Sequence, residues 1–196
     1  MKRKYDQVYQ FKITLKEIKP PIWRRIQVPK TYTFWDLHVA IQDAMGWSDS
    51  HLHEFSMLNP LTGLKVNIGF PDEEFGRKVL RGWRQKIADY FTLENRIAKY
   101  EYDFGDDWVH EVLLEKILPR ERGTVYPKCV GGRRACPPED CGGVGGYENL
   151  LEIIRDPENE EYEEMLEWLG GDFDPEDFDA KKVVFDDPDK RLKNIF

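Results

Sequence analysis

Apolar and polar residues alternate over several separate stretches, and this pattern is what most constrains the fold. Apolar side chains occupy every second position from Tyr9 to Leu15, and a second alternating run covers 22–28. Two more runs, 98–104 and 108–114, flank a Gly-Asp-Asp turn at 105–107. Period two places alternate side chains on opposite faces of a strand, and a short turn between two such runs favours an antiparallel hairpin. The sequence therefore predicts a β-sheet with one apolar face.

One helix is expected between the strands. Thr33 is suited to its N-cap, apolar residues recur at helical spacing from 34 to 45, and Gly46 suits a left-handed end. The resulting strand–strand–helix–strand order resembles the start of a β-grasp fold. The predicted fold class is α+β. It consists of a mostly antiparallel or mixed sheet of five to six strands with one crossing helix and an acidic helical C-terminal part.

The 196 residues are expected to form a single α+β domain over 1–196. Within it we expect a sheet-rich part at 1–118, a Gly/Pro/Cys loop at 119–146, a helical part at 147–185 and a polar tail at 186–196. A loop of that length in a compact domain is unusual unless something holds it in place.

Composition excludes several classes of protein. Hydrophobic residues make up 40% of the chain and aromatic residues 13%, which is enough to build a core. No apolar run is long enough for a membrane helix, the N-terminus lacks a secretory signal, and three cysteines give no disulfide framework. We therefore expect a cytoplasmic protein without a membrane partner.

Charge is distributed unevenly along the chain. The first hundred residues carry 17 basic and 11 acidic side chains, whereas the remainder carry 12 basic and 26 acidic ones. A basic front suits contact with nucleic acid, and an acidic back opposes it. The alternative is that these charges only form solvated faces. Nucleic acid is thus one partner to test, and the partner is otherwise unknown.

Three cysteines, Cys129, Cys136 and Cys141, gather in the Gly/Pro-rich loop. With a histidine as fourth ligand they would form a zinc site, which would explain how the loop is held, although the tight Cys-x-x-Cys spacing is absent. The alternative is that they are reduced thiols packed under the loop. Zinc is the one cofactor that these residues suggest.

Histidines and carboxylates offer a second chemistry. His110 shares a hairpin with Asp103, Asp106 and Asp107, and His51 lies on another predicted strand. Such ligands suit a hydrolytic metal site with an open coordination position. The alternative is an ordinary turn made by Gly and Asp residues.

Four motifs occur together in order: IWRR at 22–25, HLHEF at 51–55, YDFGDDWVH at 102–110, and ACPPEDCGG at 135–143 followed by GY at 146–147. On these motifs the chain resembles the plasmid-borne open-reading-frame-three-like family, some of whose members are labelled insertion-element passenger proteins. The resemblance covers about residues 7 to 183. It implies a prokaryotic α+β single domain associated with mobile elements, and it supplies no activity.

The main functional hypothesis is a noncatalytic binding or accessory protein associated with mobile elements. The alternative is a metal-dependent hydrolase acting on a nucleic-acid or phosphate substrate, so the sequence leaves open whether the protein is an enzyme. The expected binding surface joins the polar and aromatic motif residues to the 129–147 loop. These residues are Trp23, Arg24, Arg25, His51, His53, Asp106, Trp108 and His110.

Overall fold

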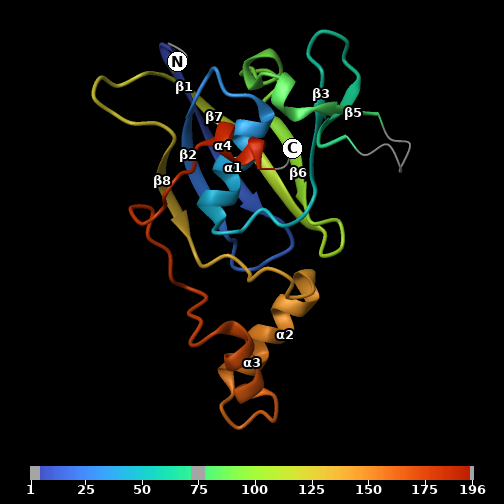
Figure 1. The fold of residues 1–196 in the computed structure, drawn as a ribbon, viewed down its shortest axis with the longest axis vertical. Helices are drawn as coiled ribbons and strands as arrows, with labels where there is room; N and C mark the ends of the chain where they lie inside the picture. The colour runs from blue at the N-terminus through green and yellow to red at the C-terminus, as the bar shows by residue number, and fades with distance from the viewer. Residues whose placement is uncertain (1–4, 72–77, 195–196) are drawn as a thin grey trace.

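A computed structural model describes residues 5–71 and 78–194. They form one mixed eight-stranded sheet with the order β5-β4-β3-β6-β7-β1-β2-β8 (Figure 1). The strands are β1 (Gln7–Leu15), β2 (Trp23–Pro29), β3 (His53–Leu58), β4 (Lys65–Gly69), β5 (Val79–Arg81), β6 (Ile97–Tyr102), β7 (Trp108–Pro119) and β8 (Lys128–Arg133). Among the described strands only β4 and β5 pair in parallel.

Four short α-helices accompany the sheet in the described residues: α1 (Phe34–Met45), α2 (Gly143–Arg155), α3 (Tyr162–Leu169) and α4 (Pro188–Lys193). Two single-turn 3-10 helices, η1 (Gly82–Arg84) and η2 (Ile87–Asp89), follow β5. No helix in this part of the chain is long and apolar enough to cross a membrane.

The predicted fold class was wrong in three respects. The sheet has eight strands instead of five to six, the described residues form four short helices instead of one crossing helix with a helical C-terminal part, and the fold is mostly β. The additional strands have weak sequence signals. β5 has three residues, and β8 contains Gly131 and Gly132 within the stretch expected to be irregular. β5 is defined by its backbone pairing with β4, and β8 by its pairing with β2. Sequence patterns do not report such pairing.

Alternation along β1 explains how the core forms. Phe11, Ile13 and Leu15 point to the buried face and are at most 1% exposed. The intervening Lys12 and Thr14 are only partly buried. Helix α1 lies across the buried face (Figure 1). Burial of large side chains of this kind stabilises a fold by roughly 1.5–3 kcal/mol each, so the alternating strands and α1 form the main core.

The ends of α1 are fixed as the sequence predicts. Thr33 Oγ1 accepts a hydrogen bond from the Asp36 backbone N–H at 3.2 Å, and the Asp36 carboxylate accepts one from the Thr33 N–H at 2.8 Å. This capping box satisfies two N–H groups that would otherwise lack partners. Gly46 ends the helix with φ +96°, a left-handed conformation that glycine adopts without strain.

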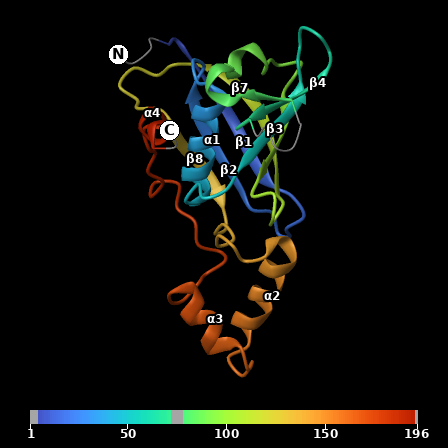
Figure 2. The same ribbon diagram turned by 45° about the vertical axis from the view of Figure 1, so that its right-hand side comes forward.

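Helices α2 and α3 form an arm that projects from one end of the sheet, as Figure 2 shows. We call residues 143–169 the helical arm. The chain then returns along the molecule to α4, which docks on α1. There Trp35 Nε1 donates to the Pro188 carbonyl at 2.9 Å, and the Arg191 guanidinium pairs with Asp43 at 2.7 Å. These contacts fasten the C-terminal segment to α1.

The segment between β8 and the arm is held by contacts with several elements. Trp47 Nε1 donates to the Pro137 carbonyl at 3.0 Å, and Arg134 donates to the Pro20 carbonyl at 2.7 Å. The Ala135 backbone N–H donates to the Pro175 carbonyl at 3.0 Å. These hydrogen bonds hold the Gly/Pro-rich stretch in place.

Candidate metal centre

Three carboxylates surround one imidazole nitrogen where the arm joins the sheet. His51 Nε2 lies 2.9 Å from Asp140 Oδ1, 3.6 Å from Asp103 Oδ2 and 3.7 Å from Glu139 Oε2. Ligand atoms of His51, Asp103 and Asp140 all lie within 4.8 Å of one another. We call these three residues, with Glu139 beside them, the open His–carboxylate group.

The members of the open His–carboxylate group come from different loops and turns of the chain. His51 precedes β3, and the Asp103 N–H donates to the Leu52 carbonyl at 3.0 Å, which ties the turn after β6 to that loop. Asp103 Oδ1 accepts from the Gly105 N–H at 2.9 Å, and Oδ2 faces His51. Asp103 and Asp140 adopt positive φ values of 55° and 58°, a conformation that Asp tolerates better than most residues.

Glu139 is oriented by hydrogen bonds from two neighbours. Its Oε1 accepts from the Ser48 N–H at 2.7 Å, and both of its oxygens accept from the Tyr102 hydroxyl at 3.1 Å. Burial and the nearby Glu139 charge raise the pKa of Tyr102, so the phenol stays protonated and donates. Glu139 is therefore fixed before any ligand binds, while Asp140 remains 68% exposed.

The geometry around His51 Nε2 fits a metal ion as well as it fits the ion pair with Asp140. This atom is buried and makes no hydrogen bond among the described residues, although the His51 side chain is 30% exposed. Ligands about 2.1 Å from a metal lie about 3.0 Å apart at right angles and about 3.4 Å apart in a tetrahedron. The distances from His51 Nε2 to Asp140 and Asp103, 2.9 and 3.6 Å, bracket these values.

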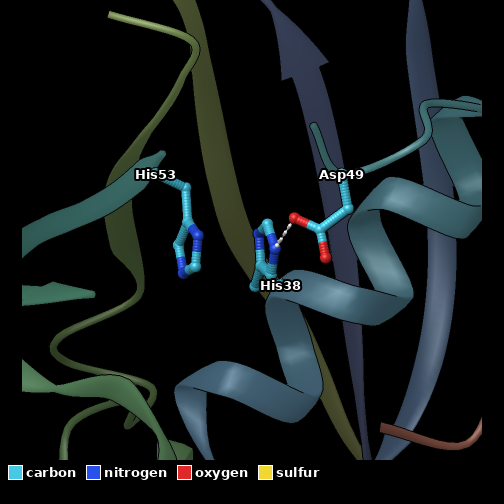
Figure 3. A group of neighbouring side chains, drawn as sticks. All are labelled: His38, Asp49 and His53. Carbon is cyan, nitrogen blue, oxygen red and sulfur yellow. Dashed lines mark hydrogen bonds and ion pairs between the residues drawn. The ribbon is translucent and has the colours of Figure 1, made fainter. Parts of the chain in front are cut away.

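A second group of potential ligands, His38, Asp49 and His53, lies inside the molecule (Figure 3). His38 Nε2 donates to Asp49 Oδ1 at 2.7 Å, and His38 Nδ1 accepts from the Tyr100 hydroxyl at 2.9 Å. Tyr100 itself accepts from Gln42 Nε2 at 2.9 Å, which leaves its O–H free to donate. This chain of donors fixes His38 as a neutral imidazole.

The buried histidine pair, His38 and His53, does not fit a metal. The two rings stack with centroids 3.4 Å apart and an interplanar angle of 7°. Imidazole binds metals in the plane of its ring, and two parallel planes this far apart cannot converge on one ion. Burial lowers the pKa of both rings well below the usual histidine value, with Arg191 adding to the effect at His38 and His38 adding to it at His53. The pair is therefore a neutral stack.

The three cysteines are not part of either ligand group found among the described residues. Cys129 Sγ lies 3.5 Å from the Gly131 carbonyl oxygen. Burial raises the pKa of Cys129 and of Cys136, and it raises that of Cys141 to about 12. The thiols are therefore protonated at neutral pH in the metal-free protein, and zinc would displace their protons on binding. Zinc binding by these cysteines stays a prediction.

Alternation along β2 separates the residues of the first motif. Trp23 and Arg25 lie together on the outer face, with the guanidinium 5.0 Å from the indole centroid, and Arg25 also forms a two-point ion pair with Glu115 at 2.6 and 2.8 Å. Arg24 faces inward and is 1% exposed. It donates to the carbonyls of Trp23, Ala44 and Arg133 and stacks on Phe178 at 3.8 Å.

Most of the other predicted binding residues are structural parts of the interior. Trp108 is 1% exposed, and His110 is fully buried with Nδ1 donating to the Trp108 carbonyl at 3.0 Å. Burial lowers the pKa of His110 to about 3. Asp106 accepts from the Gly142 N–H at 3.2 Å and so links the β6–β7 turn to the start of the arm. The structure thus places Asp106 against the start of the arm, and it places His53 and His110 in the core.

Two residues of the ligand groups, His38 and Asp49, were absent from the predicted site. Glu139 and Asp140 lay within its 129–147 loop without being named, and Asp103 entered only the alternative metal site. Glu139 and Asp140 carry a signal, because two acids directly follow the rigid Pro137-Pro138 pair. His38 and Asp49 carry none, since a helical histidine and a turn aspartate are ordinary in sequence.

The fold and the open His–carboxylate group together define a single-sheet, mostly β protein with a surface ligand cluster at the root of a helical arm. The chain belongs to the plasmid pRiA4b ORF-3-like protein family, whose model matches residues 7–182. This confirms the resemblance seen in the four motifs.

Two relatives cover nearly the whole chain. The uncharacterized protein y4hQ of Sinorhizobium fredii (strain NBRC 101917 / NGR234) is 35% identical over 189 residues, which are 96% of this chain and 92% of the relative. The crystal structure of the protein of unknown function MM3350 from Methanosarcina mazei Go1 is 54% identical, with a TM-score of 0.87 over 93% of this chain and all of that one. These comparisons confirm a member of the plasmid-ORF-like family and give no support to the hydrolase alternative.

Proposed function

We propose that this protein is a noncatalytic, cation-dependent accessory protein that binds one divalent transition-metal ion at the open His–carboxylate group. The observation that carries the proposal is the buried His51 Nε2, which makes no hydrogen bond although carboxylate oxygens lie 2.9, 3.6 and 3.7 Å away. One imidazole and several carboxylates form a mixed ligand set that suits Zn²⁺ and Mn²⁺ better than Mg²⁺. Zn²⁺ is the first choice because it binds imidazole and carboxylate ligands more tightly than Mn²⁺ does.

The position of the group supports a structural role for the ion. His51 lies in the loop before β3, Asp103 in the turn after β6, and Asp140 in the segment that leads into the arm. An ion shared by these three segments would join the arm to the sheet. It would also relieve the repulsion among carboxylates that converge on one point.

The remaining reactive side chains support a noncatalytic role. The cysteine thiols are protonated because burial raises their pKa values. His38, His53 and His110 are enclosed by the core and lack charge at neutral pH. These groups stabilise the fold and are not presented to a substrate.

Calorimetric titration of Zn²⁺ into the full chain, purified without a tag or chelator, tests the proposal with two matched variants. Asp140→Asn removes a ligand charge at an exposed position whose left-handed backbone Asn also adopts. Asp106→Asn removes a charge from the neighbouring turn and keeps an oxygen for the Gly142 N–H. We expect one ion per chain, an affinity at least about tenfold weaker for Asp140→Asn, and little change for Asp106→Asn. Equal losses in both variants, or no binding by the wild type, would overturn the proposal.

Co²⁺ in place of Zn²⁺ distinguishes this site from the cysteine site predicted from sequence. Thiolate ligands give Co²⁺ an intense sulfur-to-metal charge-transfer band, whereas imidazole and carboxylate ligands do not. We expect only weak visible bands, with the three thiols titrating equally with and without the ion. A strong charge-transfer band would assign the metal to Cys129, Cys136 and Cys141 instead.

A further inference from the structure

A cleft of about 490 Å³ opens between the end of α1 and the helical arm. Its walls are formed by Met45, Trp47, the Pro137-Pro138 pair, Trp168 and Phe173. This volume lies within the range of pockets that accept a small ligand or a few side chains. Aromatic side chains form part of the walls, but polar atoms contribute more of the exposed lining than apolar atoms do, so an occupant must match both.

Apolar surface on α3 continues from this cleft onto the arm. Trp168 is 50% exposed, and none of the eight α3 residues, all of which are described, is fully buried. Met165 and Leu169 are only partly buried against the core. Large, half-exposed tryptophans beside a cleft are typical anchors of protein interfaces.

The helical arm, which forms one wall of the cleft, is strongly acidic. Between Glu148 and Glu167 the arm carries nine acidic residues and one basic residue, Arg155. The cleft also borders the C-terminus of α1, where the carbonyl groups carry partial negative charge and the last turn has no basic residue. A phosphate backbone would be repelled from this surface, whereas Lys or Arg side chains would be attracted.

We infer that the cleft and the adjoining face of α3 form a docking surface for a basic segment of a partner protein. An Arg or Lys side chain of that segment lies against the Trp168 ring, and a neighbouring aromatic or branched aliphatic side chain enters the cleft. A cation over an indole gains electrostatic attraction from the ring face, and the acidic arm accelerates the encounter. This surface is distinct from the metal centre except at Glu139, which lines the edge of the cleft.

Short random peptides displayed on phage, selected on the immobilised full chain, provide a defined probe. The enriched peptides are synthesised with a fluorescent label and titrated against wild type, Trp168→Ala, and the triple charge reversal Glu163→Lys, Glu164→Lys and Glu167→Lys. Leu61→Ala is the matched control, because Leu61 is 91% exposed at the β3–β4 turn. Circular dichroism of every variant checks that the fold is retained.

We expect a consensus with Lys or Arg next to an aromatic or branched aliphatic residue. Trp168→Ala should weaken binding by about tenfold or more, equivalent to about 1.4 kcal/mol, and the charge reversal should weaken both the binding and its salt dependence. Leu61→Ala should bind as the wild type does. Enriched peptides without basic residues, peptides that bind Trp168→Ala equally well, or stronger binding to a labelled DNA duplex would each overturn the inference.

Discussion

Replacing His53 by Phe should reduce the loss of stability that acid causes. Burial lowers the pKa of His53 in the folded protein, whereas the unfolded chain has an ordinary imidazole with a pKa of about 6.5. As the pH falls below that value, the imidazole binds a proton in the unfolded state but not in the folded state. The contribution of the neutral His53 to the free energy of unfolding is therefore fully present above about pH 6.5. It is lost progressively as the pH falls toward the lower pKa of the folded state.

The size of the effect follows from this difference in proton uptake. A histidine that stays neutral in the folded state lowers the free energy of unfolding at pH 5 by about 2 kcal/mol compared with pH 8. His38 and His110 contribute in the same direction, because burial lowers their pKa values too. Burial raises the pKa of Asp43 and Asp49, which opposes the trend, so the total is smaller than three separate losses. Comparing wild type with His53→Phe isolates one imidazole.

Urea unfolding at a series of pH values measures this difference. Phe should fit the site, because His53 packs against the rings of Trp35, His38, Phe55 and Tyr100. Between pH 8 and pH 5 the free energy of unfolding should fall by about 2 kcal/mol more for the wild type than for the variant. At an ordinary m value this is a difference of about 1 M in the urea midpoint. Phe55→Leu, the control, should lower stability equally at every pH. Parallel pH profiles for wild type and His53→Phe would refute the assignment of a neutral buried pair.

Four further substitutions test how the helices are held. Arg191→Gln should cost about 2–3 kcal/mol and expose the C-terminal segment to proteases, because it leaves the buried Asp43 carboxylate without its cation; unchanged proteolysis would contradict this. Thr33→Ala should cost about 1 kcal/mol in urea unfolding, since it removes half of the capping box, and an unchanged midpoint would count against that cap. Gly146→Ala should destabilise the protein strongly, because the added Cβ would collide with a backbone carbonyl oxygen. Gly145→Ala should instead stabilise α2 by about 1 kcal/mol, because a Cβ at that position meets open space. Similar thermal midpoints for the two glycine variants would contradict this packing.

Local patterns in the sequence correctly predicted the elements that depend on neighbouring residues. The alternation in β1 and the hairpin of β6 and β7 are both present. The capping box at Thr33 is present as well. Each of these elements has its own periodic or capping signal. By contrast, β5 and β8 are defined by the strands beside them, and their short or glycine-containing sequences carry no period-two signal.

The candidate metal centre was only partly visible for the same reason. His51 was identified as a functional residue, but its carboxylate neighbours come from positions 103, 139 and 140. Their convergence depends on the turn after β6 and on the course of the chain beyond β8. Such long-range proximity follows from tertiary packing, and no spacing in the sequence reports it.

His51 and His53 show how far two identical side chains, two residues apart, can differ in chemistry. His53 begins β3 and stacks on His38 in the core, whereas His51 precedes the strand and faces three carboxylates. Only His51 can therefore bind an ion without a rearrangement of the core. Because its partners lie on the sheet and at the root of the arm, an ion that binds the assembled group more tightly than the separated segments must hold the arm in place by that same free energy.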